Sequence, residues 1–172
     1  FGSSWKSGKS EFSLSADGWK FEKNADGFKF SGGDDKISVD AAAVALAAAW
    51  RPGPFPFYKN DDGFYDYALL APRASFTGTV KFAGETREFK GTGFVDRSVA
   101  DMAPHKLAKR WLKFRFFSGE YACIFAGFAP PDAKGNAVYK GYLWLGKGSE
   151  TLFSGTDVSA SFSDFFIDKA SK

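Results

Sequence analysis

Asp96 and Arg97 follow a Gly-Thr-Gly turn, and their side chains make them the first candidates for chemistry. A carboxylate beside a guanidinium can orient a ligand hydroxyl or carbonyl through charge-assisted hydrogen bonds. The alternative is structural: Asp96 caps an irregular segment, and Arg97 is solvated. The sequence leaves both interpretations open.

His105 is the only histidine of the chain, and together with Asp96 it is a candidate catalytic acid or base. A histidine titrates near neutral pH, although a single histidine in a proline-flanked loop is often only a surface residue. One histidine and one cysteine are too few for a tetrahedral zinc site, so no metal is expected. No phosphate-binding loop is recognised, and no cofactor is expected.

Several further side chains combine an apolar body with a polar tip and are the best candidates for lining a pocket. Such residues suit a mostly hydrophobic ligand that carries one polar group. Plain core packing is the alternative for many of them. Besides Asp96 and Arg97, the candidate ligand-binding residues are Trp50, Tyr65, Tyr67, Arg73, Trp111 and Trp144.

The composition limits the class of protein. A chain of 172 residues fits one domain spanning 1–172, and its 19% of aromatic residues suit pleated sheets and flat ligands. The net charge is only +3, so nucleic acid is not expected as a partner. The single cysteine is compatible with a reducing compartment. The start at Phe1 is typical of a processed protein or of a piece of a longer one, and no targeting signal can be read. The sequence does not determine the compartment, although an intracellular location, cytoplasmic or organellar after removal of a targeting peptide, is favoured.

Alternating apolar and polar residues predict half-buried antiparallel strands along most of the chain. In the segment 19–23, Trp19 and Phe21 alternate with lysine and glutamate, and 75–82 shows the same period. In 112–117 the bases Lys113 and Arg115 alternate with apolar side chains, which indicates an outer face that carries the bases. Turn sequences such as NADG, NDDG and FAGE separate these runs. The pattern indicates an all-β sandwich or barrel.

The segment 40–50, DAAAVALAAAW, is ambiguous. Alanine is the best helix former, and Asp40 can serve as an N-cap. A strand-like KISV precedes the segment, however, and a proline-rich stretch follows it. We expect a strand here, whose small side chains would leave space in a barrel interior.

Two other segments, 121–128 and 138–146, are apolar on both strand faces. Such strands are central in a sandwich, or line a cavity on one side and contact a partner on the other. Between the strands, Met102, Leu107 and Trp111 suggest an amphipathic lid that touches a membrane transiently. A short loop helix with solvated bases is the alternative.

The order of motifs from about residue 37 to 150 resembles the lipocalin-like superfamily of hydroxyneurosporene synthase, a carotenoid hydratase, and of fungal survival-factor proteins. The hydratase-like part is GFYDYALLAPRASFTGTVKFAGETREFKGTGFVD. The survival-factor-like part is MAPHKLAKRWLKF, followed by GFAPPDAKGNAVYKGYLWLGKG. The resemblance covers about two thirds of the chain and rests on order and spacing rather than on any single motif.

The resemblance implies an antiparallel, calycin-type β-barrel with short loop helices, either a single barrel or one half of a tandem pair. Members of the superfamily handle carotenoids, polyketide-derived chains and sphingolipids. One departure concerns the hydratase reaction: those proteins have a histidine after the aspartate, and Arg97 stands there in this chain. An arginine stays protonated and cannot donate the proton that hydration needs. His105 matches the survival-factor pattern instead.

Three functions follow as hypotheses. The first is a carrier that binds a lipid, sphingolipid or carotenoid-like molecule for transport or sequestration. The second is a cofactor-free hydratase, cyclase or isomerase acting on such a ligand. The third is a non-catalytic accessory subunit of a larger complex, because a fold does not determine a function.

Overall fold

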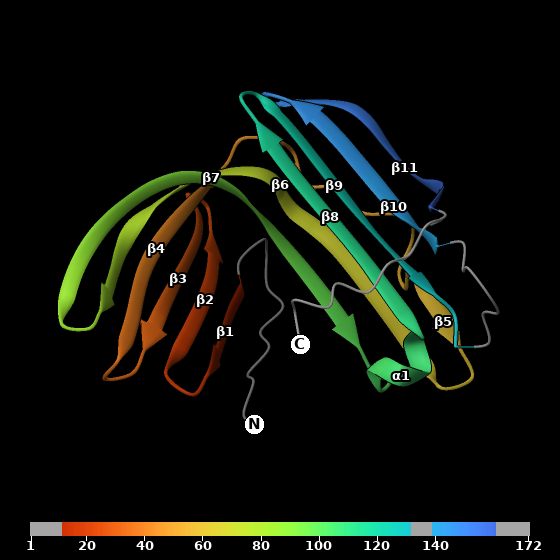
Figure 1. The fold of residues 1–172 in the computed structure, drawn as a ribbon, viewed down its shortest axis with the longest axis horizontal. Coiled ribbons are helices and arrows are strands. Elements are labelled where there is room, and N and C mark those ends of the chain that lie inside the picture. Colours follow the sequence, from red (N-terminus) through yellow and green to blue (C-terminus); the bar gives the residue numbers. More distant parts are fainter. Residues whose placement is uncertain (1–11, 132–138, 161–172) are drawn as a thin grey trace, which may run out of the picture. The chain divides into compact units, whose positions relative to one another are not determined.

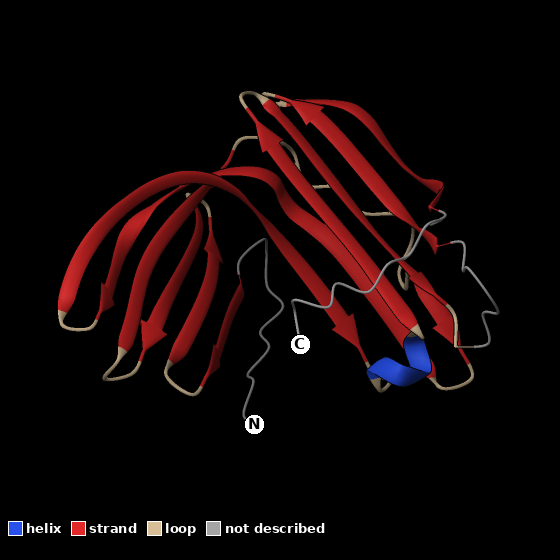
Figure 2. Ribbon diagram, in the orientation of Figure 1, coloured by secondary structure: helices blue, strands red, loops and turns tan. Residues whose placement is uncertain are grey.

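The computed structural model describes residues 12–131 and 139–160, and in these ranges it consists almost entirely of antiparallel strands (Figure 2). The all-β antiparallel fold expected from the sequence is confirmed. The elements, labelled in Figure 1, are β1 (Phe12–Ala16), β2 (Trp19–Asn24), β3 (Gly27–Gly33), β4 (Ile37–Ala45), β5 (Tyr58–Asn60), β6 (Gly63–Phe82), β7 (Glu85–Ala100), α1 (Pro104–Leu107), β8 (Arg110–Ser118), β9 (Tyr121–Ala129), β10 (Tyr139–Lys147) and β11 (Glu150–Ala160).

The chain divides into two compact units. Unit 1 comprises Phe1–Ala48 and Ala71–Val95, and unit 2 comprises Ala49–Leu70 and Asp96–Lys172. The long strands β6 and β7 contribute residues to both units. Each unit therefore has its own packing.

Unit 1 is a sheet in the strand order β1-β2-β3-β4-β6, with β7 paired to β6. Residues directly opposite each other in an antiparallel register point to the same side of the sheet. One row across the five strands is apolar: Leu14, Phe21, Phe30, Ala41 and Gly78. A row on the opposite side is mostly polar: Ser13, Glu22, Lys29, Ala42 and Thr77. The sheet therefore has one apolar face, which follows from the period-2 pattern of its strands.

The alanine-rich segment 40–50 is not helical. Its first part, up to Ala45, belongs to β4, then the chain bends, and Trp50 forms an isolated antiparallel bridge with Leu69. The strand expected for this segment is confirmed over 40–45. Helix propensity is overridden because β4 is paired on both sides, with β3 and with β6.

Small side chains in β4 and β6 allow these strands to approach closely. Ala41 and Ala43 are buried, at 6% and 3% exposure, on the apolar face. Opposite Ala41 stands Gly78, where a Cβ would lie 2.2 Å from the backbone oxygen of Asp40. A larger residue at Gly78 would force the two strands apart.

Unit 2 has a two-layer core. One layer contains β5 with the first part of β6 and the end of β7, and the other is the sheet β8-β9-β10-β11. Rings from the two layers meet in the middle: Tyr65 lies 5.7 Å from Trp111, and Tyr67 stacks on Tyr142 at 4.4 Å between ring centroids. Trp144 is fully buried. This core is closed by aromatic side chains from both layers.

The strands predicted to be apolar on both faces are β9 and β10; residue 138 lies outside the described residues. On one face Ile124 and Trp144 are buried in the two-layer core. The other face carries Phe125 and Leu143, which oppose each other and are only partly covered. The prediction of two apolar faces is confirmed.

The sequence predicted that the bases of β8, Lys113 and Arg115, lie on its outer face, and this prediction is wrong. Arg115 lies on the same side as the buried Ile124, which it opposes, and it forms an ion pair across the core. Phe114 and Phe116 are on the other side and remain 51% and 48% exposed. The register explains this: Trp111 opposes the buried Phe128 and packs against its ring, so Phe114 and Phe116, at the alternate positions of β8, point to the other side.

Within residues 12–131 and 139–160 the strand pairings form two open ladders that do not close into a ring. In one ladder β1, β5 and β7 each pair with a single neighbour, and in the other β8 and β11 do. The antiparallel architecture is thus established, whereas closure into a barrel stays a prediction.

Candidate functional site

The apolar face of the unit 1 sheet is the first candidate surface for a ligand. Its rings lie against one another: Trp19 stacks on Phe30 at 5.2 Å, and Phe21 stacks on Phe28 at 6.0 Å. Phe30 nevertheless stays 39% exposed. Beside these rings, Ala41 presents only a methyl group. Ala41 is buried, so the exposed part of this face is formed by the aromatic rings.

A hollow of about 250 Å³ opens on this face. Its lining is almost entirely apolar, and the residues that form it are Leu14, Ser15, Ala16, Trp19, Lys20, Phe21 and Phe30. Apolar concavities with few polar groups are typical binding sites for hydrophobic molecules.

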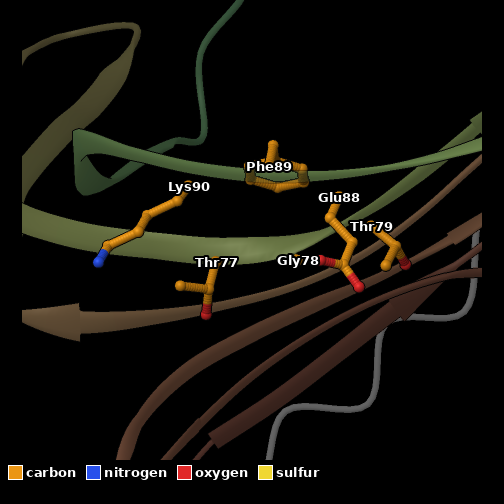
Figure 3. A pocket seen from close by; sticks show the side chains of 6 residues that line it. All are labelled: Thr77, Gly78, Thr79, Glu88, Phe89 and Lys90. Atoms are coloured by element: carbon orange, nitrogen blue, oxygen red, sulfur yellow. The ribbon is translucent and has the colours of Figure 1, made fainter.

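A larger hollow of about 550 Å³ lies along β6 and β7 (Figure 3). The residues that line it are Thr77, Gly78, Thr79, Glu88, Phe89 and Lys90. Glu88 and Lys90 are exposed, so water solvates both charges. This hollow offers no desolvated group that would select a ligand.

Asp96 belongs to a polar cluster in unit 2. Its Oδ2 accepts a hydrogen bond from the Tyr67 hydroxyl at 2.9 Å and one from Nη2 of Arg115 at 3.2 Å. The side chains of Asp96 and Arg115 are both 30% exposed. Because both contacts fall on Oδ2, the second oxygen, Oδ1, retains the capacity to accept a hydrogen bond from a ligand.

The tyrosines of this cluster stay protonated to high pH. Burial, helped by the charges of Asp96 and Asp66, raises the pKa of Tyr65 to about 12. Burial also raises the pKa of Tyr67 and of Tyr142. The Tyr142 hydroxyl is buried and makes no hydrogen bond of good geometry among the described residues. A phenol that stays protonated can donate a hydrogen bond, as Tyr67 does to Asp96.

Arg97 points away from Asp96. Its Nη1 lies 3.7 Å from Oδ2 of Asp66, and Nη2 of Arg51 lies 2.7 Å from Oδ1 of the same carboxylate. Asp66 is 1% exposed, whereas the guanidinium side chains are partly exposed. Consecutive strand residues point to opposite faces, so Asp96 and Arg97 serve two different clusters and do not hold one ligand group together.

The other candidate residues are distributed as follows. Trp50 lies 6.0 Å from the Tyr142 ring, and Trp111 is 40% exposed beside Tyr65. Trp144 is fully buried and donates from Nε1 to Thr151 Oγ1 at 3.2 Å. Trp144 thus packs in the core of unit 2, whereas Trp111 stays partly exposed, and the role of all three as ligand-binding residues stays a prediction.

Arg73 lies on the part of β6 that belongs to unit 1, where its backbone oxygen accepts from the Leu46 amide at 2.8 Å. Any contribution of Arg73 to binding also stays a prediction.

His105 is exposed in the short helix α1. In the same segment Met102 and Leu107 are buried, at 8% and 2% exposure, and Lys106 pairs with Asp62 at 2.7 Å. The apolar side of this segment therefore faces the protein, and membrane contact through Met102 and Leu107 would require them to leave the core.

Sequence reasoning did not select Asp66, Arg51, Arg115 or Tyr142 for the site. A signal for Asp66 was present, because it is a lone carboxylate inside the apolar run FYDYALL, and such a residue needs a partner when buried. Arg115 carried no comparable signal, since its pairing with Asp96 depends on the packing of two separate strands.

Two searches of the described residues gave no candidates. Over residues 12–131 and 139–160, no three histidine, cysteine or acidic side chains gather closely enough to hold a metal ion. In the same part of the chain, no helix has the length and apolar composition needed to cross a membrane.

The comparison with family models gives one match, to the model described as the Svf1 family, over residues 9–170. No curated protein and no solved structure matches the chain. The Svf1 family belongs with the lipocalin-like proteins, so the resemblance drawn from the sequence is confirmed. Since the match covers nearly the whole chain, this protein belongs to the Svf1 family.

Proposed function

We propose that the protein binds a hydrophobic small molecule, a lipid, sphingolipid or isoprenoid such as a carotenoid, for transport or sequestration. The observation that carries the proposal is the apolar face of the unit 1 sheet, where Phe30 is 39% exposed on a ring-lined hollow. Family membership supports the same class of ligand, because the Svf1 family belongs with lipocalin-like proteins.

The driving force for binding is burial of apolar surface. Each Å² of apolar area removed from water contributes about 25 cal/mol, so a chain-like ligand gains affinity along its length. The stacked Trp19 and Phe30 rings supply a flat surface for the ligand. In this proposal the strands complete a calycin-type barrel, and the apolar face lines its interior.

Unit 2 by itself offers a second candidate contact, one for a polar group of a ligand. Oδ1 of Asp96 can accept a hydrogen bond from a hydroxyl or an amide, while Tyr67 and Arg115 hold the carboxylate through Oδ2. A charge-assisted hydrogen bond of this kind discriminates between a ligand with a donor and one without.

An enzyme acting on such a ligand is the second candidate, and Asp96 favours it. A carboxylate held by a phenol and a guanidinium can take or give a proton at its other oxygen. Conversion of a bound ligand that is lost in Asp96→Asn would establish the enzyme. Recovery of unchanged ligand from both proteins would establish the carrier.

Native mass spectrometry of the purified chain, followed by organic extraction and lipid analysis, tests the proposed function. A stoichiometric apolar molecule supports a carrier. Absence of any ligand, with no response to panels of fatty acids, sphingosine and β-carotene, contradicts it and moves the assignment to an accessory subunit.

Two variants in β3 test whether the apolar face of unit 1 is the binding site. Phe30→Lys puts a charge on the apolar face, and we expect affinity for a pyrene-labelled fatty acid to fall at least about tenfold, since a buried unpaired charge is costly. Ser31→Lys, one residue further on the opposite face of β3, is the control and should bind as the wild type does. Equal losses in both variants would exclude the apolar face as the site.

A further inference from the structure

We infer that the hydrophobic ligand of the unit 1 sheet carries an anionic head group, a carboxylate or a phosphate, and that Lys23 binds this head group. The inference rests on the proposed function, because it specifies the polar end of the molecule that the apolar face would bind. All the residues that carry it belong to unit 1.

The register of three strands places Lys23 on the apolar face. Lys23 opposes Phe12 on β1 and Phe28 on β3, and residues that oppose each other point to the same side of a sheet. The rings of Phe12 and Phe28 both contact the ring of Phe21, at 5.5 Å and 6.0 Å between centroids. Phe21 lines the hollow on this face and lies two residues before Lys23. Lys23 therefore stands in a row of aromatic side chains next to the hollow.

The surroundings of Lys23 differ from those of the lysines on the opposite, polar face. Lys20 and Lys29 are exposed there, where Lys29 opposes Glu22 and Lys20 pairs with Glu22 at 2.9 Å. Lys23 is half-buried. A lysine in such a position lays its methylene stem along apolar surface and keeps its ammonium group near water. The ammonium of Lys23 is thus available at the border of an apolar surface.

Lys23 is the only charged side chain that the strand pairs place on the apolar face. These pairs cover every second residue of 12–16, 19–23, 28–32, 37–45 and 74–82. The two acidic residues of the same strands, Glu22 and Asp40, belong to rows of the opposite face. An apolar surface that carries one ammonium is complementary to an apolar molecule that carries one anionic group.

The length of the face indicates a long alkyl tail. In the row of Lys23, Ala43 of β4 opposes Phe28. At the other end of β4, Ile37 opposes Phe82, and these side chains are 39% and 64% exposed. The six residues from Ala43 to Ile37 rise about 3.3 Å each, which gives an apolar path of about 20 Å. A long-chain acid fits this path with its head group at Lys23.

Displacement of a neutral fluorescent probe, N-phenyl-1-naphthylamine, tests the inference on the full chain. Palmitic acid, hexadecyl phosphate and hexadecanol have alkyl chains of equal length and differ in the head group. We expect the better of the two anions to displace the probe at a concentration at least about fivefold lower than hexadecanol, because an ammonium forms a charge-assisted hydrogen bond with it. The anion that binds more tightly identifies the head group as a carboxylate or a phosphate.

Substitutions at Lys23 test whether its charge causes this preference. Lys23→Met keeps a long apolar stem without the charge, so the preference for the anion should disappear. Lys23→Arg should keep the preference, and Lys23→Glu should replace it with a preference for hexadecylamine. Lys29→Met removes an exposed lysine from the polar face and is the matched control, which should behave as the wild type does. Circular dichroism checks that each variant folds.

Three results would overturn the inference, and they separate it from the proposed function. Equal displacement by the two anions and hexadecanol would exclude an anionic head group and leave the proposed binding of a hydrophobic molecule intact. A preference for the anion that persists in Lys23→Met and Lys23→Glu would exclude Lys23 as the contact. Failure of all three compounds to displace a bound probe, or of the probe to bind, would contradict the proposed function and the inference together.

Discussion

Unit 1 and unit 2 are both rich in aromatic rings, but the two units use different rings. All six tyrosines of the chain lie in the residues of unit 2. The described rings of unit 1 are phenylalanines and Trp19. In unit 2 the polar tips meet partners, as Tyr67 does at Asp96 and Trp144 at Thr151. In unit 1 the rings form one face of a sheet that stays partly exposed.

From this difference between the units, we expect unit 2 to contribute mainly to stability and unit 1 mainly to binding. A two-layer core with buried tryptophan and tyrosine gains most of its free energy from packing within the unit. A sheet whose apolar face stays partly exposed gains less from folding and keeps apolar surface for another molecule. On this basis substitutions in the core of unit 2 should destabilise the fold, and substitutions on the face of unit 1 should change binding.

Matched tryptophan deletions are expected to give the largest effect. Trp144→Ala removes a side chain with no exposed surface and should lower the free energy of unfolding by about 3–5 kcal/mol. Trp19→Ala removes a partly exposed ring from the face of unit 1 and should cost less than about 1.5 kcal/mol. Urea unfolding followed by circular dichroism measures both. Equal costs would mean that unit 1 is packed as tightly as unit 2.

The carboxylates give a second comparison of the two units. Asp66→Asn leaves Arg51 and Arg97 without their shared buried counter-charge and should cost about 2–3 kcal/mol, at the low end for a broken buried pair because both guanidiniums are partly exposed. Asp40→Asn, at an exposed position of β4 in unit 1, should change stability by no more than about 0.5 kcal/mol. The same urea titration applies. A neutral Asp66→Asn would show that the ion cluster is dispensable.

Alkaline pH should act on unit 2 more than on unit 1. Tyr65 has its pKa raised from 10.0 to about 12, so above pH 10 the unfolded chain loses this proton while the folded chain keeps it. The stability contributed by Tyr65 is therefore complete below pH 10 and is lost as the pH rises toward 12. Tyr67 and Tyr142 act in the same direction.

Tyr65→Phe checks this effect, because the variant cannot ionise at that position. Its free energy of unfolding should fall less steeply between pH 10 and 12 than that of the wild type. Identical slopes in the two proteins would show that Tyr65 is not protected from ionisation by the core of unit 2.

Much of the fold follows from local patterns. The alternation around Trp19 and Phe21, the turn sequences and the two-sided apolar strands each predicted an element that the structure contains. The arrangement of the candidate site followed less directly from the sequence than the fold did. Asp96 and Arg97 looked like one polar pair because they are adjacent, yet strand geometry sends them to opposite faces. Trp50 contacts the Tyr142 ring and Trp144 is fully buried, and their predicted role in lining a ligand pocket stays a prediction.

The sequence by itself determined the all-β antiparallel class and the membership in a lipocalin-like family, because strand period, turn residues and motif order are local properties of the chain. Only the tertiary structure decided which face of each strand is covered. Lys113 and Arg115 have equal local signals, but Arg115 meets Asp96, while Lys113 stays exposed. Such pairings depend on residues far apart in the chain: Trp111 packs against Phe128 on the same side of β8 as Arg115.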